Sequence, residues 1–168
     1  PILINVFLPL TLEVNALPFL GEKCEQYKYS SSQLFKDKSN SVVEITTTDA
    51  QGSGFVVKQD TDHTYILTNA HVIGNNQEVD IKWVNQENVK GQVVGNLGGD
   101  ELSNDLALIK VEGKRGTPQV FLRKPPEIGS DAVVIGSPNG LEFSLTRGVI
   151  SQVRENNNFI QIDAPVNP

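Results

Sequence analysis

Apolar residues recur in short stretches from Ser41 to the end of the chain, and in several stretches they alternate with polar residues. Val79, Ile81 and Trp83 occupy every second position, which is the period of a strand with one buried face. Residues 106–109 are continuously apolar, as in a strand buried on both faces. Strands are expected at residues 41–48, 55–58, 65–68, 78–84, 90–95 and 106–109, and again at 132–135, 143–153 and 159–163.

The first six strands are enough for one small closed antiparallel barrel that ends near Val111. The later strands predict a second barrel that is incomplete. Residues 113–126 are basic and contain glycine and proline, so they are expected to connect the two barrels. We therefore predict an all-β protein with an N-terminal segment at residues 1–40, a first barrel at 41–124 and a partial second barrel at 125–168.

The N-terminal segment leaves two interpretations open. Residues 2–12 are strongly apolar, and residues 14–16 (Val-Asn-Ala) resemble the small-x-small end of a secretory signal, but Glu13 lies where the apolar core of a signal is still uncharged. The segment is either the remnant of a signal peptide or an irregular stretch that packs on the body of the protein. It is too short to span a membrane. Residues 24–40 are polar and are expected to include a short helix that ends near Lys38.

Composition narrows the class of protein. The chain has 168 residues, of which 38% are hydrophobic and 20% charged, as is usual for a soluble globular protein. Its net charge of -6 argues against a nucleic-acid partner, because such binding needs a basic surface. A lone cysteine, Cys24, excludes a disulfide within these residues. His63, His71 and Cys24 lack the spacing of metal ligands, so neither a metal nor a cofactor is expected.

The most informative stretch runs from Gly52 to Ile73. It begins Gly-Ser-Gly-Phe, continues through a strand, a polar turn and a second strand, and ends Leu-Thr-Asn-Ala-His-Val-Ile. A histidine at the end of a strand is usually structural, but this combination resembles the histidine segment of the trypsin-like serine proteases. The closest likeness is to the HtrA/Deg branch, which are extracytoplasmic proteases of protein quality control. Val72 follows His71 where the trypsin branch has a cysteine, which favours the bacterial-type branch.

A carboxylate, Asp105, lies directly before the continuously apolar strand. Residues 105–110 have the sequence Asp-Leu-Ala-Leu-Ile-Lys. On its own Asp105 would be an ordinary turn residue. Together with His71 it resembles the aspartate segment of the same family, in the histidine-then-aspartate order of the chymotrypsin-like fold. The resemblance implies that His71 is the base that activates a serine hydroxyl and that Asp105 holds the imidazole in the correct tautomer.

The nucleophile of such a triad is not found in the sequence. No Gly-x-Ser-Gly-Gly, Gly-Asp-Ser-Gly or Gly-x-Ser-x-Gly occurs, and the nearest imitations, at Ser53 and Ser137, are not expected to act as nucleophiles. Residues 144–151 and 159–168 match the approach to the nucleophile loop in the family. The resemblance therefore implies that the serine and the oxyanion hole follow Pro168, and that the fold is a trypsin-like double barrel cut short.

Two functions follow as hypotheses. In the first, the chain is a fragment of a serine endopeptidase of protein quality control that acts on unfolded proteins or peptides outside the cytoplasm and is inactive on its own. In the second, it is a non-catalytic relative that binds peptides or a partner protein. The aromatic residues Tyr27, Tyr29 and Phe35 allow a homotrimer by resemblance, or they cover the barrel.

Overall fold

The computed structural model describes residues 6–7, 29–84, 88–98, 104–121, 124–137, 143–154 and 159–166. Cys24 and Tyr27 lie outside the described residues, as do the signal-like positions 14–16.

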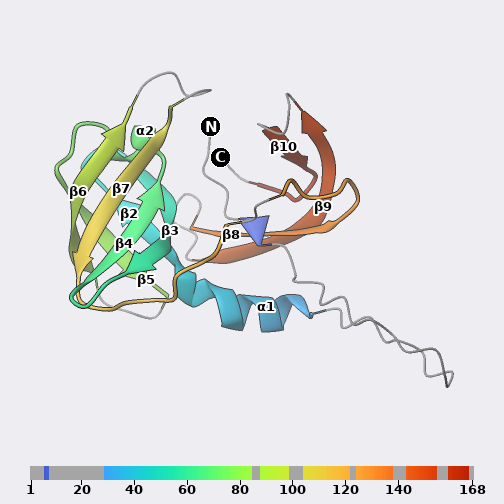
Figure 1. Cartoon of the computed structure of the whole chain (residues 1–168), viewed down its shortest axis with the longest axis horizontal. Coiled ribbons are helices and arrows are strands. Elements are labelled where there is room, and N and C mark those ends of the chain that lie inside the picture. The colour runs from blue at the N-terminus through green and yellow to red at the C-terminus, as the bar shows by residue number, and fades with distance from the viewer. Residues whose placement is uncertain are drawn as a thin grey trace, which may run out of the picture.

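Six strands form the closed antiparallel barrel that the alternation predicts, seen at the left of Figure 1. In their order around the barrel they are β2 (Val42–Thr46), β3 (Gln51–Gln59), β4 (His63–Thr68), β7 (Leu106–Glu112), β6 (Val89–Leu97) and β5 (Glu78–Trp83). The prediction of an all-β fold with one closed barrel is confirmed. Strand β3 is longer than its apolar stretch, because backbone pairing continues through polar positions such as Gln51 and Gln59.

The barrel encloses its own core. Val79, Ile81 and Trp83, the alternating residues of β5, are fully buried there, as their spacing predicts. Each Val or Ile side chain buried in this way stabilises the fold by about 1.5–3 kcal/mol relative to an exposed one. The same core includes Ala70, Val72 and Ile73 from a one-turn helix, α2 (Ala70–Ile73), which lies at the upper end of the barrel in Figure 1.

The second sheet is open and antiparallel, with the strand order β1-β8-β9-β10. Its members are β1 (Val6–Phe7), β8 (Asp131–Gly136), β9 (Ser144–Arg154) and β10 (Phe159–Ile162). Strand β1 was not predicted, and it pairs with β8 through Val6 opposite Val134 and Phe7 opposite Val133. A two-residue strand has too few positions to show alternation, so its partner decides its conformation.

An α-helix, α1 (Ser31–Lys38), lies below the two sheets in Figure 1 and ends where the sequence predicts. Ser30 caps it by accepting a hydrogen bond from the backbone N–H of Gln33 at 3.1 Å. A 3₁₀ turn, η1 (Ser39–Ser41), leads from α1 into β2. A second apolar cluster joins the helix, the barrel and the second sheet; its buried members are Leu34, Val42, Val133, Ile135 and Phe143, with Phe35 packed against them.

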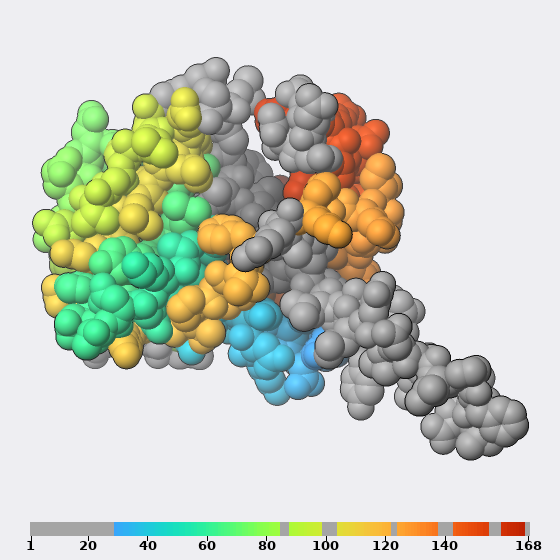
Figure 2. Space-filling view, viewed as in Figure 1, coloured from blue at the N-terminus to red at the C-terminus, as the bar shows by residue number. Residues whose placement is uncertain are grey.

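The connection between the sheets runs along the barrel surface, where Figure 2 shows it in golden orange between the green strands and the blue helix. Gln119 donates its backbone N–H to the carbonyl of Val56 at 2.9 Å. Gly116 has a φ of +69°, and a Cβ there would lie 2.6 Å from Nε1 of Trp83. Only glycine permits this conformation and this approach without strain. The glycine lets the connection lie close to Trp83 of β5, and the hydrogen bond of Gln119 holds it to β3.

Candidate active site

Helix α2 presents His71 directly after β4. Strand β4 ends at Thr68, Asn69 has an extended backbone, and Gly74, with a φ of 55°, ends the helix after a single turn. The sequence placed His71 just past the strand but did not predict the helix. Four residues are too few for a helical period to be visible, so packing of the turn on the barrel core stabilises it instead.

Asp105 lies immediately before β7 and contacts His71 with both carboxylate oxygens. The distance from Nδ1 of His71 to Oδ2 of Asp105 is 2.6 Å, and the backbone N–H of His71 donates to Oδ1 at 2.9 Å. The pairing of β4 with β7 brings the two together, because Thr68 lies opposite Ala107 in that ladder. The two residues that the sequence singled out therefore meet, and the carboxylate fixes both the ring and the backbone of His71.

Asn69 is a member of the site that sequence reasoning missed. Its side-chain amide donates to Oδ2 of Asp105 at 2.9 Å and to the backbone carbonyl of Asp105 at 3.2 Å. An Asn before a helix normally accepts a hydrogen bond from one of the first free N–H groups of that helix. Here the carboxylate of Asp105, and not the side chain of Asn69, accepts the hydrogen bond from the backbone N–H of His71. The amide of Asn69 donates to Asp105. No local sequence signal singled out Asn69, because its partner Asp105 lies 36 positions away.

The electrostatics of the pair keep the carboxylate charged. The side chain of Asp105 is only 8% exposed, whereas that of His71 is 38% exposed. Burial by itself raises the pKa of Asp105, but hydrogen bonds from the backbone and ring of His71 and from Asn69 outweigh it and hold the pKa below its ordinary value. Because an ionised carboxylate can only accept, Nδ1 of His71 carries a proton, and in the neutral ring Nε2 has a free lone pair.

The Gly-Ser-Gly segment supports the helix that carries His71. A Cβ on Gly52 would lie 2.6 Å from a methyl group of Val72, the residue that follows His71. The carbonyl of Ser53 accepts a hydrogen bond from the buried hydroxyl of Thr68 at 2.9 Å. The motif therefore lets β3 approach α2 closely.

The two serines in nucleophile-like contexts meet each other. The backbone N–H of Ser137 donates to the hydroxyl oxygen of Ser53 at 2.9 Å, and the hydroxyl of Ser137 donates to the carboxylate of Glu44. Ser137 is 1% exposed, so no peptide bond can reach its hydroxyl. This contact joins the barrel to the second sheet.

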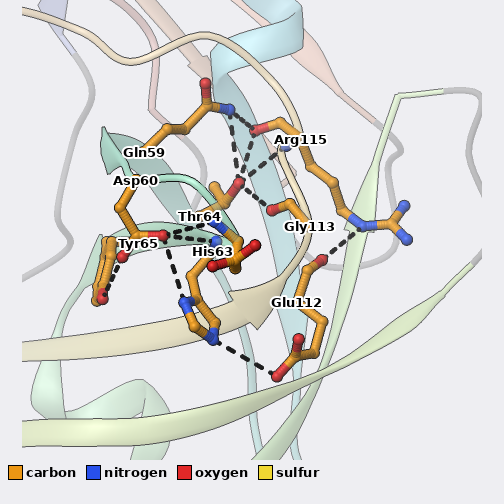
Figure 3. Close-up of polar contacts among 9 residues, drawn as sticks. Gln59, Asp60, His63, Thr64, Tyr65, Glu112, Gly113 and Arg115 are labelled. Atoms are coloured by element: carbon orange, nitrogen blue, oxygen red, sulfur yellow. Dashed lines mark hydrogen bonds and ion pairs between the residues drawn. The ribbon is translucent and has the colours of Figure 1, made fainter.

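His63 lies at the opposite end of β4 from His71 and belongs to a separate polar cluster, drawn in Figure 3. Its Nδ1 is 3.3 Å from Oδ1 of Asp60, and its Nε2 is 3.6 Å from Oε1 of Glu112. The backbone N–H of Asp62 and the hydroxyl of Tyr65 also donate to Asp60, and the pKa of Asp60 is accordingly lowered to about 2. His63 thus ties the β3–β4 turn to the end of β7.

The same cluster holds the start of the connection between the sheets. The hydroxyl of Thr64 donates to the carbonyl of Gly113 at 2.8 Å and accepts from the N–H of Arg115 at 2.8 Å, while the side chain of Gln59 donates to the carbonyl of Arg115 at 2.7 Å (Figure 3). The polar cluster around His63 therefore has a structural role, because it fixes the start of the connection to the end of the barrel.

Within the part of the chain that the structure describes, no group of three or more His, Cys, Asp or Glu side chains is arranged to hold a metal ion. None of the described helices has the length and apolar character needed to cross a membrane.

A closed antiparallel barrel with a His–Asp pair at one end, joined to a second antiparallel sheet, defines the trypsin-like fold. The family model for the trypsin-like peptidase domain matches residues 52–168, and the chain therefore belongs to that family. This confirms the resemblance drawn from the histidine and aspartate segments.

The relatives are serine endoproteases of the DegP and HtrA type. The chain is 35% identical over 125 residues to a probable periplasmic serine endoprotease DegP-like of Pseudomonas fluorescens, covering 70% of this chain and 25% of that protein. It is 33% identical over 156 residues to a serine protease HtrA-like of Staphylococcus aureus, covering 82% of this chain and 19% of that protein. The chain spans about a quarter or less of the length of these curated relatives.

A solved structure supports the same assignment. The serine endoprotease from Yersinia pestis superposes with a TM-score of 0.69 at 28% sequence identity, over 84% of this chain and 51% of that one.

Proposed function

We propose that this chain carries the histidine and the carboxylate of a serine endopeptidase triad, with His71 as the general base and Asp105 as its orienting group. The observation that carries the proposal is the 2.6 Å contact from Nδ1 of His71 to Oδ2 of Asp105. It leaves Nε2 to take the proton from a serine hydroxyl and to return it to the leaving amine. The buried carboxylate stabilises the imidazolium that forms between these steps.

The nucleophilic serine, in this proposal, follows Pro168, together with the backbone N–H groups of the oxyanion hole. Family patterning and the absence of a Gly-x-Ser-Gly-Gly motif from these residues support this placement. Neither Ser53 nor Ser137 is expected to supply the nucleophile, because Ser53 accepts a hydrogen bond from the backbone of Ser137 and the hydroxyl of Ser137 donates to Glu44. Residues 1–168 alone are therefore expected to cleave nothing.

The expected substrates are unfolded proteins or peptides, as the resemblance to the HtrA/Deg branch implies. The expected location is outside the cytoplasm, because the Pseudomonas fluorescens relative is a probable periplasmic endoprotease. A homotrimer and the division of the chain at residues 40 and 124 belong to the same proposal. The alternative, a non-catalytic module that binds peptides or a partner protein, is less well supported. A binding surface needs no carboxylate aligned on the Nδ1 atom of a histidine.

Casein hydrolysis by four purified proteins tests the proposal: residues 1–168, the protein expressed from its complete coding sequence, and the latter with His71→Ala or with Asp105→Asn. We expect no turnover from residues 1–168, because the loss of a triad serine alone costs about 10⁶ in kcat in subtilisin, which has a different fold. His71→Ala should abolish turnover of the complete protein. Asp105→Asn should reduce it by about 10⁴, because the amide favours the wrong tautomer.

Activity in residues 1–168, or full activity in the His71→Ala protein, would overturn this function. A complete protein that binds casein but never cleaves it would favour the alternative.

A further inference from the structure

Three polar side chains join the barrel to the second sheet: Glu44 on β2, Ser53 on β3 and Ser137 directly after β8. We call them the inter-sheet contact. Ser137 donates its backbone N–H to Ser53 at 2.9 Å and its hydroxyl to Glu44. Glu44 and Ser53 lie opposite each other in the β2–β3 ladder, so the two acceptors stand side by side on the barrel. Because Ser137 is buried, its donor groups are shielded from water, whereas Glu44 and Ser53 are partly buried.

Ser53 is also bonded on its other side to the segment that carries the proposed base. Its carbonyl accepts from the hydroxyl of Thr68, a fully buried residue that ends β4 and precedes Asn69. One residue earlier, Gly52 approaches Val72 so closely that no Cβ would fit. Two adjacent residues of β3, Gly52 and Ser53, therefore contact the segment that carries His71, and Ser53 also contacts the second sheet.

The apolar cluster between the sheets cannot fix their relative position as finely. Burial of Val42, Val133 and Ile135 there is non-directional, and it tolerates small sliding of one sheet over the other. The hydrogen bonds of the inter-sheet contact are directional and lose strength steeply when bent. If Ser53 or Glu44 is removed, the buried Ser137 loses a hydrogen-bond acceptor, and this cost makes the contact resistant to displacement.

We propose that Ser53 is a positioning residue, which through the inter-sheet contact sets the second sheet relative to His71. The inference rests on the proposed function, since the serine loop would extend from β10 of the second sheet and must meet Nε2 of His71. A misplacement of about 1 Å between reacting groups can cost a factor of about 10² in rate. The inter-sheet contact thus aligns the serine loop of the second sheet with His71 at the end of the barrel.

Four variants of the complete protein test this role. Ser53→Ala removes the acceptor for the N–H of Ser137, and Ser137→Ala removes the donor to Glu44 from the other side. Glu44→Gln keeps an acceptor oxygen and is the conservative variant. Ser32→Ala is the matched control, because it makes the same chemical change at an exposed position of α1.

In a peptide assay run well below each melting temperature, Ser53→Ala and Ser137→Ala should each lower kcat about five- to tenfold, the effect of one lost hydrogen bond, with KM nearly unchanged. Glu44→Gln should keep most of the activity, and Ser32→Ala should match the parent. Equal kcat values in Ser53→Ala, Ser137→Ala and Ser32→Ala would overturn the inference.

Amide hydrogen exchange provides a readout that needs no activity. Ser53→Ala should accelerate exchange at Ser137 and also at residues 69–72, whereas Ser32→Ala should accelerate neither. Faster exchange at Ser137 alone would mean that the contact does not reach the histidine segment, and the inference would fail. If the complete protein is inactive but the exchange of both segments is coupled, the proposed function fails and the inter-sheet coupling stands.

Discussion

Asp105 is held by more hydrogen-bond partners than contact with the ring of a single histidine would require. One oxygen accepts from the backbone of His71 and the other from the ring of His71 and the amide of Asn69. With every acceptor directed at a fixed donor, the carboxylate cannot rotate away from the ring. At the residue scale, Asn69 therefore helps to fix the orientation of the Asp105 carboxylate relative to the ring of His71.

Asn69→Ala tests this influence. The change removes two donors from Asp105, so we expect the pKa of Asp105 to rise towards the ordinary carboxyl value and the free energy of unfolding to fall by about 1–3 kcal/mol. Since the folded-state pKa of Asp105 is depressed, its stabilising contribution is present above the ordinary carboxyl pKa and is lost as the pH falls through the folded value. The variant should show less of this acid-side loss.

The measurement is an NMR titration of the Asp105 carboxyl carbon, together with urea unfolding at several pH values. Asn76→Ala is the control, because the side chain of Asn76 donates to the carbonyl of Ile73 at the other end of α2 and does not touch Asp105. Identical titration curves for Asn69→Ala and the parent would contradict the assigned role.

At the scale of elements, helix α2 is too short to be stable on its own and depends on the strand beneath it. Val72 is buried against β3, at the point where Gly52 leaves room for its methyl groups. The local structure that presents His71 therefore depends on a residue that is far away in the sequence and has no side chain of its own.

Gly52→Ala should destabilise the protein by about 1–3 kcal/mol, since its Cβ would lie 2.6 Å from Cγ2 of Val72 and an overpacked site must shift. Gly95→Ala is the matched control, because a Cβ there would lie 3.5 Å from Cβ of Leu108, an ordinary contact. Urea unfolding measures both. The double variant Gly52→Ala, Val72→Ala should be less destabilised than the sum of the two single variants, because the methyl groups that the new Cβ would meet are gone. Failure of Gly52→Ala to differ from Gly95→Ala would refute the packing argument.

At the scale of the whole molecule, the two sheets differ in closure. The barrel has no free edge, but the second sheet ends in β10, where Phe159 is 39% and Ile160 45% exposed. An edge strand with apolar side chains is a template for pairing with another chain.

Residues 1–168 alone are therefore expected to self-associate through β10, and Ile160→Lys should suppress this because a charge at the edge opposes pairing. Val120→Lys provides the control, since Val120 is 88% exposed on the connection between the sheets and not on a sheet edge. Sedimentation velocity over a range of concentrations measures the effect. A monomeric parent chain, or equal suppression by both lysine variants, would show that β10 is not the associating surface.

Most strands and the class of fold could be predicted from the sequence alone. Alternation such as that of Val79, Ile81 and Trp83 depends only on neighbouring residues and on which face of a strand is buried, so no long-range contact is needed to see it. The histidine and aspartate segments were recognised for the same reason, as short local patterns. Elements that escaped prediction, β1 and α2, are too short to show a period.

The tertiary structure alone decided how these segments act together. Asn69 bonds to a residue 36 positions away, and Ser53 to one 84 positions away. Such partners are chosen by the register of β4 on β7 and by the docking of β8 on β2 and β3. Neither the register nor the docking can be predicted from residues that are neighbours in the sequence, because both result from the closing of the barrel and the burial of two apolar clusters. For that reason the residues that orient Asp105 and join the sheets became visible only in the folded protein.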